Sequence, residues 1–127
     1  MLLSSTNPAR LRDWYVAVFG VTAATTPDGA YDVLGFGPDP AHTFWVMIDS
    51  RDDVGESNPE PGRVVLNVDV DDAQATAHAV DASGARRLAP LENRDGSWFG
   101  TAIDPDGNYV QIVQLSEAMR SEMERVS

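Results

Sequence analysis

Three predicted strands carry the side chains best suited to binding a small molecule. In residues 42–50, 63–70 and 108–115, apolar side chains alternate with a mixed set, a two-residue period typical of strands with two different faces. The apolar faces, which are expected to be buried, carry Phe44, Val46 and Ile48, then Val64, Leu66 and Val68, then Val110 and Ile112. The mixed faces supply one candidate ligand-binding set: Trp45, Met47, Arg63, Asn67, Tyr109 and Gln111. Aromatic and amide groups beside one cation are a suitable lining for a small organic ligand.

Arg63 is the one charged residue in this set. Its guanidinium could bind a carboxylate, a phosphate or an enolate through two parallel hydrogen bonds. An ion pair with a nearby aspartate is an equally good interpretation. The apolar members could also be ordinary core residues, with Asn67 and Gln111 solvated at strand ends. Both interpretations stay open on the sequence alone.

The sequence gives little support to a thiol, metal or acid–base catalytic site. The absence of cysteine excludes thiol nucleophiles, disulfides and zinc–thiolate sites. The two histidines, His42 and His78, lack the spacing of metal ligands and are expected at the surface. Asp49 shares the phase of Met47 and is a weak candidate for a lone general base, but no Ser–His–Asp arrangement is present. Catalytic residues therefore stay unassigned, and no cofactor is expected.

The composition restricts the class of partner. Nine basic against twenty acidic residues give a net charge of −11, which disfavours nucleic acid and anionic membranes. A cationic ligand would be attracted, although solubility alone also explains an acidic surface. No apolar run approaches the roughly 18 residues of a membrane span, and the first residues lack a signal-peptide pattern. We therefore expect a soluble, cytoplasmic protein.

The elements that position these side chains follow from turn and cap signals. Asp104-Pro105-Asp106-Gly107 is a complete tight turn, because proline fixes φ and glycine accepts a positive φ. One helix is predicted from Pro8 after an Asn7 cap to Gly20, and a second over 73–82 after Asp71 or Asp72. The predicted strands are 2–6, 21–26, 30–36, 42–50, 63–70, 85–92, 98–103 and 108–115.

These elements form an internal repeat of strand, helix, strand, strand, strand. Asn7 and Asp71 are separated by 64 positions, as are Gly20 and Gly84. The sequence thus predicts one α+β domain over 1–127, built from two βαβββ modules. Module one covers about 1–50, a linker 51–62, module two about 63–115 and a C-terminal helix 116–127.

This order of elements, the helix ending in Trp14-Tyr15 and Phe19-Gly20, and the turn Asp104-Pro-Asp-Gly-Asn resemble the vicinal oxygen chelate superfamily, which includes glyoxalases, bleomycin resistance proteins and extradiol dioxygenases. The resemblance implies that the modules form curved mixed sheets, that helices cover the convex sheet faces and that ligand lies in the concave cup, where the six candidate residues would lie. It also implies a homodimer, since such proteins often complete their cups by pairing.

The metal enzymes of this superfamily place four ligands on the first and last strands of each module. By resemblance, three of these positions fall on Met47, Arg63 and Gln111, and the fourth, 64 residues before Arg63, would precede Met1. A soft thioether and a cation do not suit a divalent metal, and Gln111 alone could coordinate. We therefore expect no metal site of the usual kind.

Three functions remain in competition. The first is a metal-free, bleomycin resistance-like protein that binds a small organic molecule in the cup. The alternative is a lyase or isomerase acting on a small carbonyl compound, with Arg63 stabilising an oxyanion. The third is a structural or regulatory dimer. Arg63 favours an anionic or enolisable guest, whereas the net charge favours a cation.

Overall fold

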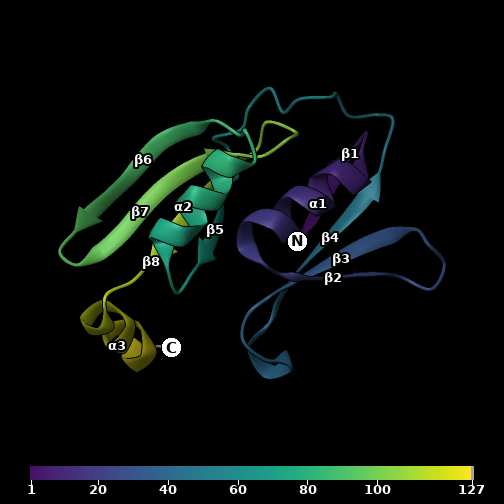
Figure 1. The fold of residues 1–127 in the computed structure, drawn as a ribbon. Helices are drawn as coiled ribbons and strands as arrows, with labels where there is room; N and C mark the ends of the chain where they lie inside the picture. The colour runs from purple at the N-terminus through teal and green to yellow at the C-terminus, as the bar shows by residue number, and fades with distance from the viewer. Residues whose placement is uncertain (127) are drawn as a thin grey trace.

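The computed structural model describes residues 1–126 and contains two four-stranded sheets with three helices (Figure 1). In chain order the elements are β1 (Leu2–Ser5), α1 (Pro8–Phe19), β2 (Thr22–Thr25), β3 (Tyr31–Phe36), the 3₁₀ turn η1 (Pro40–His42), β4 (Phe44–Ser50), β5 (Leu66–Asp69), α2 (Ala73–Ala82), β6 (Arg87–Arg94), β7 (Ser97–Ile103), β8 (Tyr109–Gln114) and α3 (Glu117–Val126). Ser127, the last residue of the predicted C-terminal helix, lies outside the described residues.

The two sheets have the same topology. The first has strand order β1-β4-β3-β2 and the second β5-β8-β7-β6. In each, the first strand runs parallel to the last, and the other pairings are antiparallel. Both sheets are open and mixed, each with one helix between its first and second strands. The predicted α+β fold of two βαβββ modules is therefore confirmed.

The helices α1 and α2 lie side by side on the same side of the two sheets and run in opposite directions (Figure 1). The Asn7 side chain caps α1 by accepting from the Arg10 amide, and Gly20 ends it with a φ of 65°. Asp72, not Asp71, caps α2 by accepting from the Ala75 amide, so the two caps are 65 residues apart. The predicted offset of 64 holds for the left-handed glycines Gly20 and Gly84. It is one residue short for the N-caps and one residue long for the C-caps, because Ser83 is the C-cap of α2.

The core fills the space between helices and sheets. Leu11, Tyr15 and Val18 of α1 are buried against sheet one, where Val46 and Ile48 of β4 are also buried. The predicted aliphatic faces of β5 and β8 are likewise buried: Leu66, Val68, Val110 and Ile112. Two members of the predicted stripes differ, because Phe44 is 50% exposed and Val64 is 62% exposed.

The start of β5 explains Val64. Leu66 pairs with Val110, and by that register Arg63 would face Gly107, which belongs to the turn and not to β8. β8 begins only at Tyr109. Residues 63–65 lie outside the sheet, and the Arg63 amide donates to the Glu60 carbonyl. The prediction that this strand begins at Arg63 is wrong by three residues.

The three helices are too short or too polar to cross a membrane. This holds for all helices in residues 1–126, the part of the chain that the structure describes.

Candidate functional site

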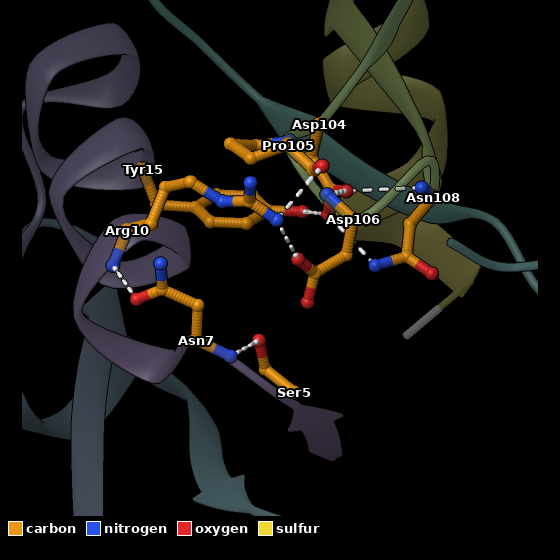
Figure 2. A network of polar contacts seen from close by, with 8 residues as sticks. All are labelled: Ser5, Asn7, Arg10, Tyr15, Asp104, Pro105, Asp106 and Asn108. Carbon is orange, nitrogen blue, oxygen red and sulfur yellow. Dashed lines mark hydrogen bonds and ion pairs between the residues drawn. The ribbon is translucent and has the colours of Figure 1, made fainter. Parts of the chain in front are cut away.

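The Asp104 turn carries a network of hydrogen bonds that joins the two modules (Figure 2). Gly107 has a φ of 80°, and its amide donates to the Asp104 carbonyl at 2.9 Å, as the turn prediction requires. The Asp104 Oδ1 accepts from the backbone amides of Asp106 and Asn108, both at 2.9 Å. Its Oδ2 accepts from the Tyr15 hydroxyl at 2.7 Å and from Asn108 Nδ2 at 2.9 Å.

Burial dominates the electrostatics of this network. Removal from water raises the pKa of Asp104, although the hydrogen bonds from Asn108 and Tyr15 oppose the rise. Burial first, and the Asp104 charge second, raise the pKa of Tyr15 well above its usual value. Arg10 of α1 adds an ion pair to Asp106 at 3.0 Å. Every oxygen of Asp104 is satisfied, so we interpret the network as a structural connection between α1 and the β7–β8 turn.

The other candidate surface is the side of each sheet turned away from α1 and α2, here called the open faces. On sheet one, the register places Leu2, Val33 and Met47 side by side, and Ser4, Tyr31 and Asp49 form the next row. On sheet two, Asn67, Thr101 and Gln111 form one row. Trp45, two residues before Met47, is 51% exposed although it is a large aromatic side chain.

The structure thus divides the six predicted ligand-binding residues into groups. Trp45 and Met47 lie on the open face of β4, and Asn67, Tyr109 and Gln111 lie on the open face of β5 and β8. Arg63 lies before β5, is 75% exposed, and pairs with Glu60 at 3.3 Å. Its surroundings match the alternative interpretation of an ion pair, with a glutamate as the partner.

Asp49, and not Arg63, is a charged residue on the open face of β4. Within the described part of the chain, its Oδ1 is buried and has no hydrogen-bond partner. A buried carboxylate oxygen without a donor is costly, so Asp49 is a side chain of the open faces with an unmet hydrogen bond. The sequence indicated Asp49 by its phase with Met47. Its neighbours Ser4 and Tyr31 were missed, because strand pairing cannot be read from one sequence.

The residues present do not fit the divalent metal that the superfamily implies. The prediction that a first-strand position precedes Met1 is wrong, since β1 places Leu2 opposite Met47 and Ser4 opposite Asp49. The equivalent position in module two is Asn67, opposite Gln111, and not Arg63. Among residues 1–126, no three His, Cys, Asp or Glu side chains gather closely enough to hold a metal ion. One carboxylate with neutral amide and hydroxyl oxygens makes a weak donor set.

A cleft of about 690 Å³ lies between the modules, where the C-terminal end of α1 meets the N-terminal end of α2. Residues from both faces of β5 line it, so it runs along the edge of that strand. Three aromatic residues line it: Phe19, Phe36 and Phe44. Four charged residues also line it: Asp69, Asp71, Asp72 and Arg120. Asn67 is the member of the predicted set that it contains. Sequence reasoning missed this cleft, because Phe44 was assigned to the core.

Solved structures with this fold are numerous. The hypothetical protein SA1046 from S. aureus aligns with a TM-score of 0.73 at 15% identity, over 91% of both chains. A glyoxylase/bleomycin resistance protein/dioxygenase domain from Frankia sp. EAN1pec gives 0.69 at 14% identity, over 91% of this chain and 94% of that one. A glyoxalase I mutant from Zea mays gives 0.71 at 18% identity, and its alignment covers 95% of this chain but only 47% of the maize chain. At these identities the likeness establishes the fold alone.

The two open, mixed sheets are the fold that these structures share. Residues 1–113 match the family described as the glyoxalase-like domain. The family match supports the resemblance to the vicinal oxygen chelate superfamily that the sequence motifs indicated. The chain belongs to this glyoxalase-like family. No curated protein sequence matches it.

Proposed function

We propose that this protein binds a small organic molecule on its open faces without a metal ion. The observation that carries the proposal is the buried, unpartnered Oδ1 of Asp49, on the same face of β4 as the half-exposed Trp45. An apolar ring beside a hydrogen-bond acceptor is the usual composition of a site for a small ligand. Because the acceptor is a carboxylate, the ligand group that meets it is a hydrogen-bond donor: a hydroxyl, an amide or an amine.

The amide groups of sheet two support the same assignment. Asn67 and Gln111 are adjacent across β5 and β8, and Thr101 lies opposite Gln111 on β7. These groups both donate and accept hydrogen bonds, so they can orient a ligand without strong charge. Arg63 has no part in this proposal, which removes the sequence-based reason for preferring an anionic ligand.

A thermal-shift screen of hydroxylated, amine-containing and dicarbonyl compounds tests the proposal, since a ligand of the folded state raises its stability by RT ln(1 + [L]/Kd). We expect hits whose shift is lost in Trp45→Ala and in Gln111→Ala, and is kept in the control Asp52→Asn. Asp52 is exposed in the loop after β4. Hits that keep their full shift in both folded test variants would place the ligand elsewhere.

The second candidate is a lyase or isomerase of the same superfamily acting on a small carbonyl compound. Asp49 favours it, because a carboxylate oxygen without a donor can accept a proton from carbon next to a carbonyl. Turnover of a dicarbonyl hit, followed by NMR, separates the two functions. An enzyme loses turnover in Asp49→Asn but keeps ligand binding through Trp45, whereas a binding protein shows no turnover in either form.

A further inference from the structure

The seam between the modules is closed at one end and open at the other. At the closed end, Tyr15 and Arg10 of α1 bond to Asp104 and Asp106. Midway, Trp14 Nε1 donates to the Ser83 hydroxyl at the end of α2. One turn after Tyr15, the seam widens into the cleft of about 690 Å³, a volume within the ordinary range for small-ligand sites.

The walls of the cleft are aromatic and come from three elements. Phe19 ends α1, Phe36 ends β3, and Phe44 begins β4. The rings of Phe19 and Phe36 pack edge to face with centroids 6.1 Å apart, so their positions are fixed by each other. Phe44 is half exposed, which leaves part of its ring free to contact a ligand. An aromatic wall of this kind accepts an apolar group or the face of a cation.

The charged groups of the cleft are predominantly acidic. Asp69, Asp71 and Asp72 line it against a single guanidinium, Arg120 of α3. Arg120 is already held by Asp69 through two bonds of 2.9 and 3.1 Å. Asp72 is engaged as the cap of α2, whereas the exposed Asp71 acts on Arg120 only through space. The cleft therefore has a negative excess that its own cation does not cancel, in a protein whose net charge is −11.

We propose that this cleft is a second binding site, separate from the open faces, for a small organic cation with an apolar body. The apolar body packs on Phe44 and Phe19, and the cationic head lies toward Asp71, where carboxylate and ring faces attract the same charge. An anion of equal size is repelled by the three aspartates. Asn67 lines the cleft and also belongs to the open face of β5, but the walls that bind the apolar group differ, because Phe44 and Trp45 project to opposite faces of β4.

Calorimetric titration of the full chain with benzyltrimethylammonium, 2-phenylethanol and phenylacetate tests this inference. We expect the cation to bind about 5- to 10-fold more tightly than the neutral alcohol, and phenylacetate not to bind. Phe44→Ala should abolish binding of the cation, and Asp71→Asn should weaken it about 3-fold, in line with the modest strength of exposed charge interactions. The matched control Asp52→Asn removes the same charge at the opposite end of β4 and should leave the affinity unchanged.

Trp45→Ala distinguishes the two sites, since Trp45 and Phe44 are adjacent and equally exposed. Cleft binding survives this substitution. Equal affinity for the three probes, no binding of the cation, or full affinity in Phe44→Ala would overturn the inference. Loss of cation binding in Trp45→Ala with retention in Phe44→Ala would also overturn it, while supporting the site on the open faces.

Discussion

Asp104 and Asp49 differ in how many hydrogen bonds the protein donates to their buried carboxylate oxygens. All four hydrogen bonds to Asp104 come from the protein itself, including one from the other module through Tyr15. Asp49 has a buried oxygen for which residues 1–126 provide no donor. The first arrangement stabilises the fold, and the second is the observation that carries the proposed ligand site.

Removing the Tyr15 hydroxyl should destabilise the protein in a pH-dependent way. Tyr15→Phe deletes a hydrogen bond to a charged, buried carboxylate, and we expect the free energy of unfolding to fall by about 1.5–3 kcal/mol at pH 7. The folded-state pKa of Asp104 is raised, so its contribution to stability is full below the unfolded pKa and is lost as pH rises through the folded one. Without the Tyr15 donor this pKa rises further, so the loss of stability should shrink as the pH falls through the raised folded-state pKa of Asp104.

Denaturant unfolding of both proteins at pH 7 and pH 3.5 measures this effect. The control is Tyr31→Phe, because the Tyr31 hydroxyl makes no hydrogen bond in the described part of the chain. It should change the stability by less than about 0.5 kcal/mol. A Tyr15→Phe loss that is the same at both pH values would mean that the ionised form of Asp104 does not depend on this hydroxyl.

The opposite result is expected at Asp49. Asp49→Asn removes a buried charge that lacks a donor, so the free energy of unfolding should stay equal or rise by up to about 1 kcal/mol. The same substitution should reduce, without abolishing, the thermal shift caused by ligands of the open faces, because Trp45 still contacts them. Denaturant unfolding and the ligand screen measure the two effects on one variant. A marked loss of stability would show that Asp49 is a structural residue.

At the scale of elements, the Asp104 turn depends on a glycine. Gly107 has a φ of 80°, and a Cβ there would lie 2.7 Å from Ser57 Oγ in the linker. Gly107→Ala should therefore cost about 1–2 kcal/mol for the left-handed backbone alone, and should also displace residue 57. The control Gly55→Ala is in the same linker, where no contact is closer than 3.6 Å. Chemical denaturation compares the two, and an equal effect of both would contradict this account of the turn.

Local signals predicted most of these elements. The caps at Asn7 and Gly20 and the turn at Gly107 act within a few residues, and all of them are confirmed. The start of β5 depended on where its partner β8 begins, which is a tertiary fact. The predicted strand therefore included Arg63. Because of this error, an exposed arginine that lies in a loop was assigned to the candidate site.

The candidate site was harder to predict than the fold for the same reason. Alternation along β4 assigned Trp45 and Met47 to one face, because strand phase is a local property. It also assigned Phe44 to the core, since phase says nothing about whether a neighbouring element covers the end of a strand. The cleft at Phe44 is lined by residues of both modules, so it depends on how the modules pack together. An aromatic pair at a strand start, one residue on each face, was the signal available.

At the scale of the whole molecule, we expect the purified protein to contain much less than one divalent metal ion per chain. The oxygen donors on the first and last strands, Ser4, Asp49, Asn67 and Gln111, include only one charged group, which gives low affinity for a divalent cation. Elemental analysis after purification without chelators measures the content. One tightly held nickel, zinc, iron or manganese ion per chain would contradict this donor assignment.

The open faces also bear on assembly, and we propose that the protein is a homodimer. Leu2 is 50% exposed and Trp45 is 51% exposed, on the same open face of β1 and β4. A second copy that covers this face would bury both side chains, at about 25 cal/mol for each Å² of apolar surface. Two-fold pairing presents the same patch twice, so a single favourable contact is counted twice in the dimer.

Light scattering at micromolar concentration should report about twice the 13.7 kDa mass of the chain. Trp45→Glu places an unpaired charge in the proposed interface and should shift the mass toward the monomer. The control is Val16→Glu, because Val16 is exposed on α1, on the opposite side of the sheets; it should stay dimeric. A monomeric mass for the unsubstituted chain would leave the open faces in contact with solvent, and a ligand there would then have to be held by one chain alone.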